Sequence, residues 1–277
     1  MARAGRDHGL EPGITRRSSI VVEVAVSQSS THAAAAVKPR VKHPYSRLPN
    51  WLYPAFVAVA LSLFGIFATY VVFFTTTGNY DPYLSPFYSP RVRVGSIPPA
   101  VWAAWAPLTF RLTCYYYRKA YYRSFFWHPR SCAVPEPARG RYRGDTAFPW
   151  VLNNLHRFAF YVTAVQVGFL WFDAIVAFKF GDHFGIGLGS MLMLVNVLLL
   201  SGYTFGCHAF RHLAGGELDC FSCSAAARAR FRLWKGVSIL NIRHDRWAWA
   251  SLLSVAGTDI YIRLLIAGVL HDPRWIS

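Results

Sequence analysis

Histidine and cysteine side chains gather in one short stretch of this chain. Cys207, His208 and His212 lie close together, and Cys220 and Cys223 follow soon after. Two histidines at i and i+4 share one face of a helix, and two cysteines separated by two residues can bind one metal. Imidazole and thiolate are ligands of zinc and of redox iron. The stretch therefore predicts a metal centre.

The segments around this stretch have the composition of an integral membrane protein. Of the 277 residues, 54% are hydrophobic and only 15% are charged, whereas about 25% are charged in an average soluble protein. Four apolar runs are each long enough to cross a bilayer core of about 30 Å. They cover about 52–76, 148–178, 185–207 and 247–270.

A fifth predicted span, about 98–117, contains Pro107 and Arg111. A proline inside a membrane helix is tolerated where neighbouring groups bond to the carbonyl that it frees. The sequence therefore predicts an all-α integral membrane protein, a bundle of five transmembrane helices within residues 45–277. Residues 1–44, which are polar and basic, are expected to form a disordered cytoplasmic tail.

The distribution of basic residues predicts the orientation. If the N-terminus lies in the cytoplasm, segments 1–50, 118–147 and 207–246 lie inside and hold 22 of the 29 Lys and Arg residues. This agrees with the positive-inside rule, and it favours the fifth span, without which the basic segment 118–147 would lie outside. The C-terminus is then outside. The net charge of +16 belongs mostly to inner loops, so we expect no nucleic acid as a partner.

This topology brings every cysteine and four of the histidines to the inner side of the membrane. A Rieske-type 2Fe–2S cluster takes two cysteines on one iron and two histidines on the other, and this set can supply them. A b haem would need two facing histidines, such as His156 with His208, His212 or His244. A structural zinc site is a third possibility. The inner set is Cys114, Cys132, His156, Cys207, His208, His212, Cys220, Cys223 and His244.

Three blocks of sequence resemble the membrane-anchor subunit of actinobacterial succinate dehydrogenases. They are residues 109–126, residues 207–212 with Gly215 and Gly216, and residues 234–244, continued at 258–263 and 271–274. The resemblance covers roughly 50–277. It implies a multi-pass subunit of complex II in the bacterial plasma membrane. A flavoprotein subunit would oxidise succinate, an iron–sulfur subunit would relay the electrons, and this chain would pass them to menaquinone.

The resemblance also implies a Rieske-type 2Fe–2S cluster in this subunit, where other classes of complex II carry b haem. The pool of metal ligands is then His156, His208, His212, His244, Cys207, Cys220 and Cys223, with Cys114 and Cys132 in reserve. Spacing favours His208 and His212 with Cys220 and Cys223. Depth in the membrane favours exchanging some of these for His156, Cys207 or His244.

A quinone site needs donors for the carbonyl oxygens within an apolar slot. Arg111 and Tyr115 are expected to project together at i and i+4 of the second span. Arg157 neighbours His156, and Trp247 stands at the entrance of the last span. Asp259 is a further candidate, although with Arg263 at i+4 it also fits a structural ion pair.

The basic inner segments 118–147 and 224–246 are placed to dock the soluble subunits or to bind anionic lipid headgroups. No catalytic residue for succinate oxidation is expected on this chain. The alternative function is a non-redox scaffold or transporter whose cysteines and histidines hold a structural zinc ion.

Overall fold

A computed structural model describes residues 49, 51–92, 95–127, 146, 148, 150–216 and 218–276. The chain divides into two units, Met1–Arg47 and Leu48–Ser277, and only the second contains described residues. The predicted tail (1–44) and Cys132 lie outside them. The helices are α1 (Leu52–Phe74), α2 (Pro99–Thr113), α3 (Tyr115–Tyr121), α4 (His156–Val176), α5 (Leu188–Phe205), α6 (His208–Gly215), α7 (Ala225–Ile242) and α8 (His244–Ile266).

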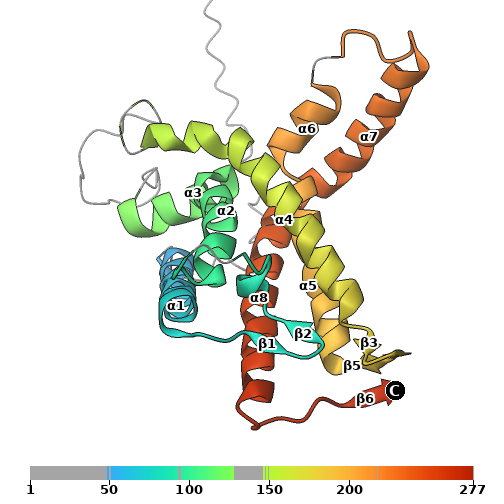
Figure 1. Ribbon diagram of the computed structural model, residues 1–277. Coiled ribbons are helices and arrows are strands. Elements are labelled where there is room, and N and C mark those ends of the chain that lie inside the picture. Colours follow the sequence, from blue (N-terminus) through green and yellow to red (C-terminus); the bar gives the residue numbers. More distant parts are fainter. Residues whose placement is uncertain are drawn as a thin grey trace, which may run out of the picture. The chain divides into compact units, whose positions relative to one another are not determined.

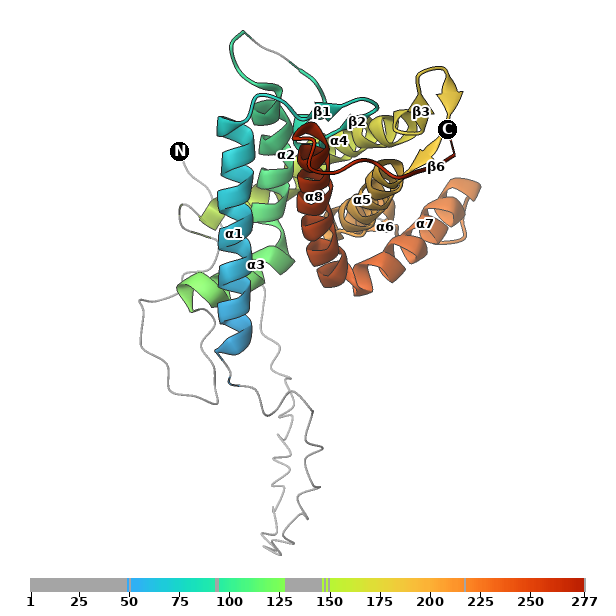
Figure 2. The same cartoon turned by 90° about the horizontal axis from the view of Figure 1, so that it is seen from below.

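The prediction of a helical membrane protein is confirmed. Within the described residues, four segments are long and apolar enough to cross a membrane: Leu52–Phe74, Val151–Val176, Leu188–Phe205 and His244–Ile266. They agree with four of the predicted spans, although α5 begins later than expected. In Figures 1 and 2, α5 packs against both α4 and α8, with the short strands at one end and α3, α6 and α7 towards the other.

The fifth predicted span, about 98–117, is divided between two helices. Its first helix, α2, ends at Thr113 because Cys114 adopts an extended conformation (φ −67°, ψ 130°), and α3 begins directly after it. The 15 residues of α2 rise about 22 Å, less than a bilayer core of about 30 Å. The fifth span and the cytoplasmic N-terminus therefore stay predictions.

A side chain from α4 compensates for the proline in α2. Pro107 has no N–H group, so it leaves the carbonyl of Ala103 without its usual helical partner. The Gln166 side chain donates through Nε2 to that carbonyl at 2.6 Å and to the Ser89 carbonyl at 3.1 Å. Gln166 of α4 thus supplies the hydrogen bond that Pro107 cannot donate within α2.

A glycine allows α5 and α8 to approach closely. A Cβ atom on Gly202 would lie 2.8 Å from the indole ring of Trp247, a distance that real Cβ contacts do not adopt. The tryptophan ring therefore packs directly on the backbone of α5. This contact sets the spacing of the two helices near the end that carries Cys207 and His244.

A cap covers the opposite end of the bundle. We define the cap as residues 75–92, which include β1 (Asn79–Tyr80), β2 (Tyr83–Leu84) and the 3₁₀ helix η2 (Pro86–Tyr88). Three of its hydroxyls donate to carboxylates from other elements: Tyr83 to Asp272 at 2.5 Å, Ser85 to Asp259, and Ser89 to Asp173.

Short strand pairs complete the same end. β1 pairs with β2, β3 (Lys179–Phe180) pairs with β4 (His183–Phe184), and β5 (Ile186–Gly187) pairs with β6 (Arg274–Ile276). The last pair ties the segment after α8 to the start of α5. The C-terminal segment is thereby held against the bundle.

Candidate functional site

The structure does not assemble the metal site favoured by spacing. His208 and His212 do share one face of α6, with their Nε2 atoms 3.0 Å apart. Cys220 and Cys223, however, form a disulfide with each other, so neither sulfur is a free thiolate. Across the described ranges, no three His, Cys, Asp or Glu side chains lie close enough to hold one metal ion.

Four other members of the predicted set lie at one end of the bundle, each at a helix terminus. Cys114 separates α2 from α3, His156 begins α4, Cys207 precedes α6 and His244 begins α8. The Sγ atom of Cys114 lies 3.8 Å from Nε2 of His244. Cys114 and Cys207 are buried free thiols within the same apolar cluster. Tertiary packing thus gathers two thiols and two imidazoles from four helix ends.

Two aromatic rings link the two imidazoles. The His156 ring stacks on Phe110, with ring centroids 4.5 Å apart and planes 7° apart. Tyr203 packs edge-on against Phe110 at 5.3 Å and stacks on His244 at 5.0 Å. Both imidazoles therefore have defined ring planes.

Buried polar atoms without a hydrogen-bond partner concentrate at the same place. The described residues contain seven such side-chain atoms, and four of them are Tyr203 Oη, Thr204 Oγ1, His244 Nδ1 and Trp247 Nε1. Such atoms are rare in native proteins and mark strain, catalysis or a bound group.

Two thiols and two imidazoles are the donor types of a Rieske-type cluster, which takes both cysteines on one iron and both histidines on the other. Burial raises the pKa of the Cys207 thiol to about 12, although backbone N–H groups oppose the shift. The buried thiol is therefore neutral unless a cation lies beside it.

A mostly apolar cavity of about 390 Å³ lies among α1, α2, α4 and the cap, with single contacts from α5 and α8. Its volume is within the range of small-molecule sites. Its polar lining consists of Thr69, Arg111, Thr163 and Gln166. The cavity is thus suited to a ligand with a large apolar body and few polar atoms.

Arg111 connects this cavity to the end that carries the cysteines and histidines. It lines the cavity, and its guanidinium lies 4.7 Å from the centre of the Tyr203 ring. It donates to the Ala248 carbonyl at 3.2 Å, to Ser251 Oγ at 3.0 Å and to the Tyr117 hydroxyl. These partners are neutral, so its charge remains available to a polar ligand. A cation inside a membrane bundle commonly marks a functional site.

The other predicted quinone residues do not line the cavity. Tyr115 is exposed, because the break at Cys114 ends the helix that would have placed it one turn after Arg111. Arg157 is also exposed, and Trp247 packs on Gly202.

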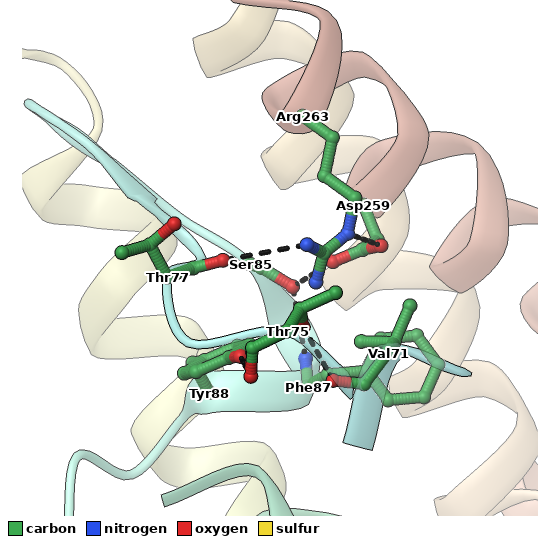
Figure 3. A network of polar contacts seen from close by, with 8 residues as sticks. All are labelled: Val71, Thr75, Thr77, Ser85, Phe87, Tyr88, Asp259 and Arg263. Carbon is green, nitrogen blue, oxygen red and sulfur yellow. Dashed lines mark hydrogen bonds and ion pairs between the residues drawn. The ribbon is translucent and has the colours of Figure 1, made fainter. Parts of the chain in front are cut away.

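Asp259 belongs to a polar network that joins α8 to the cap (Figure 3). It is fully buried, accepts from Arg263 Nε at 2.6 Å and also accepts from Ser85. Arg263 in turn donates to the carbonyl of Thr77 at 3.3 Å. Figure 3 shows the arginine reaching from α8 to the cap. These contacts match the structural ion pair that the i, i+4 spacing also allowed.

Several residues of the site carried no clear signal in the sequence. Tyr203 and Phe110 resemble other aromatic residues of apolar spans. Gln166 offered a partial signal, because an uncharged polar side chain in a span needs partners. Cys114 was only a reserve candidate.

Comparisons with known proteins agree with this architecture. Residues 52–268 match the family model of the actinobacterial succinate dehydrogenase subunit SdhC. A solved chain of the Mycobacterium smegmatis Sdh1 complex in the apo form is 38% identical, with a TM-score of 0.73, over 87% of this chain and 98% of that chain. No curated protein sequence matches. The chain is therefore a multi-pass bacterial membrane protein that belongs to the family of the actinobacterial succinate dehydrogenase subunit SdhC.

Proposed function

We propose that this chain is the membrane anchor of a succinate:quinone oxidoreductase and delivers electrons to a quinone. The observation that carries the proposal is the gathering of Cys114, His156, Cys207 and His244 beside Arg111, which lines an apolar cavity. Succinate oxidation itself takes place on a partner subunit. The similarity to a chain of an Sdh1 complex supports partnership with a flavoprotein subunit and an iron–sulfur subunit.

We assign a Rieske-type 2Fe–2S cluster to these four residues. When bound, it would supply one-electron transfer between the iron–sulfur partner and the quinone. The protein would contribute two thiolates and two neutral imidazoles from four helix ends. Phe110 and Tyr203 fix the planes of the imidazole rings and surround them with apolar surface. A b haem between His156 and His244 is the alternative.

We place the quinone, menaquinone by the family resemblance, in the cavity with its ring at the Arg111 end. An N–H group of Arg111 can donate to a quinone carbonyl, and this bond strengthens as negative charge develops on the oxygen. Apolar side chains of α1 and α2 would accommodate the isoprenoid tail. The other predicted quinone residues are not part of the cavity lining: Tyr115, Arg157, Trp247 and Asp259. Arg111 is therefore the one residue of the predicted set that we propose to contact the quinone.

The partner subunits are proposed to dock at the end that carries the four ligands. The exposed residues Arg228, Arg232 and Lys235 on α7 suit acidic partner surfaces and anionic lipid headgroups equally. Of the other basic segment, residues 128–145 lie outside the described residues. This placement requires five spans with a cytoplasmic N-terminus, which is part of the proposal.

The ligand assignment can be tested in the purified three-subunit complex. Cys114→Ser, Cys207→Ser and the pair His156→Ala with His244→Ala should each abolish the electron paramagnetic resonance signal of the membrane cluster. Quinone reduction should be lost, while succinate oxidation by an artificial acceptor continues. The pair His208→Ala with His212→Ala and the pair Cys220→Ser with Cys223→Ser are matched controls and should keep the signal.

Three results would contradict the proposal in different ways. A haem absorption band would replace the cluster by haem. Loss of the signal only in the control pairs would restore the ligand set favoured by spacing. An anchor that carries neither iron nor haem would favour the scaffold function.

A further inference from the structure

The apolar cavity is bordered by residues that are also exposed on the outside of the protein. On α1 these are Gly65, Thr69 and Phe73, and on α2 they are Trp105 and Leu108. Phe73, Trp105 and Leu108 keep 68%, 48% and 55% of their surface exposed. Residues that line a cavity and are also largely exposed mark an opening. We call this opening, bordered by these five residues, the lateral mouth.

The lateral mouth lies along the seam between α1 and α2. Its residues on α1 follow one another at i, i+4 and i+8, and those on α2 at i and i+3, so each set forms a stripe on one side of its helix. The two helices lie side by side in Figure 2. Only 17% of the most apolar stretch of α1 is buried, against 39% or more for the other three spans. The outermost helix is thus one wall of the opening.

The position of the lateral mouth along α1 places it in the hydrocarbon layer. Gly65 lies close to the middle of the span Leu52–Phe74, and a span crosses a bilayer core of about 30 Å. Thr69 donates its hydroxyl hydrogen to the Gly65 carbonyl at 2.8 Å, so this hydrogen does not face the opening. The lateral mouth therefore faces acyl chains rather than water.

We propose that a quinone reaches the cavity from the lipid through the lateral mouth, and that its isoprenoid tail occupies the opening, whose width Gly65 sets. The inference rests on the proposed function, because it assumes that the quinone ring lies at the Arg111 end. Arg111 lies towards the end of α2 that precedes Cys114, whereas Phe73 lies next to the cap. A tail that runs from the ring to the lipid therefore passes Gly65.

Gly65 is a position where a side chain can narrow the opening without disturbing the fold. Apart from its own helical backbone, no heavy atom of the described residues lies within 4 Å of a Cβ atom built on Gly65. Leucine is also a better helix former than glycine. A larger side chain at this position should therefore leave α1 intact and occupy space that the tail needs.

The test compares Gly65→Leu and the larger Gly65→Phe in the complete complex, reconstituted in lipid vesicles. The KM for a naphthoquinone with an isoprenoid tail should rise about tenfold in Gly65→Leu, and further in Gly65→Phe. A tenfold change corresponds to about 1.4 kcal/mol, close to the burial of about two methylene groups of the tail. The KM for a methyl naphthoquinone without a tail should change much less, and succinate oxidation by an artificial acceptor should stay at the wild-type rate.

Two other glycines provide matched controls. Gly168 on α4 and Gly257 on α8 are exposed on membrane spans, and a Cβ atom on either would also meet no heavy atom of the described residues within 4 Å. Neither lines the cavity. Gly168→Leu and Gly257→Leu should therefore keep the wild-type KM for both quinones.

The possible failures are distinguishable. A wild-type KM for the tailed quinone in both Gly65 variants would overturn the inference alone. Equal increases for the tailed and the tailless quinone would place Gly65 against the ring and would also overturn it. A wild-type complex that reduces neither quinone would overturn the proposed function as well.

Discussion

At the scale of single residues, two arginines of similar promise in the sequence occupy different surroundings. Arg111 lies inside the bundle, donates two hydrogen bonds to α8 and lines the cavity. Arg157 is exposed at the start of α4. A guanidinium can hold several acceptors at once, whereas a lysine ammonium is a compact, strongly hydrated charge. A substitution of Arg111 therefore tests the proposed quinone site more sharply than a substitution of Arg157.

Arg111→Lys should raise the KM for quinone by about tenfold or more. Loss of one hydrogen bond to a charged group costs about 1.5–3 kcal/mol, and about 1.4 kcal/mol corresponds to a factor of ten. Steady-state quinone reduction by the complex measures this, with succinate oxidation by an artificial acceptor as the reference. Arg157→Lys is the control and should leave KM unchanged. Equal effects of both substitutions would argue against a quinone at the Arg111 end.

At the scale of elements, α2 depends on α4 for its integrity. Pro107 frees the Ala103 carbonyl, and Gln166 satisfies it. A buried carbonyl left without a partner costs about 1–3 kcal/mol. The proline and the glutamine should therefore be coupled energetically, although they lie on different helices.

A double-mutant cycle measures this coupling. Gln166→Leu alone should lower the apparent Tm of the purified complex. In a Pro107→Ala background, residue 107 regains an N–H group that can bond to Ala103, so Gln166→Leu should cost less. The control is the single substitution Pro107→Ala, which separates the effect of the proline itself. An identical Tm decrease in both backgrounds would show that the amide does not serve this carbonyl.

At the scale of the whole membrane domain, its two ends perform separate tasks. One end gathers the free thiols and the imidazoles, whereas the cap fixes the other end through bonds to Asp173, Asp259 and Asp272. These carboxylates belong to α4, α8 and the segment after α8. The cap therefore joins elements that are distant in the sequence, as a structural clamp would.

Ser85→Ala should destabilise the complex without changing its redox chemistry. The substitution removes the hydroxyl donor to Asp259, a fully buried carboxylate, and such losses cost about 1–3 kcal/mol. Thermal unfolding should shift to lower temperature, while the cluster signal and the KM for quinone stay at wild-type values. Thr109→Ala, which removes an exposed hydroxyl, should leave all three unchanged. A change of cluster signal in Ser85→Ala would show that the two ends are coupled.

Much of this architecture follows from local sequence properties. Four spans were predicted correctly because length and apolar content belong to each segment separately. The shared end of Cys114, His156, Cys207 and His244 was predictable as well, because chain direction alternates from span to span. The pairing of His208 with His212 followed from helical geometry alone.

Tertiary structure decided which of the predicted site residues lie next to one another. The expected neighbours Arg111 and Tyr115 assumed one continuous helix, but the extended backbone of Cys114 ends α2 and brings Tyr117 to Arg111 instead.

The sequence by itself determined the class of protein, four membrane spans and the end of the bundle at which cysteine and histidine would gather. Only the tertiary structure decided which thiols are free, which imidazole rings are held by stacking, and that Arg111 lines a cavity. The physical reason is that hydropathy and helical spacing are properties of each segment by itself. Ligand geometry instead depends on how helix ends from distant segments pack against one another.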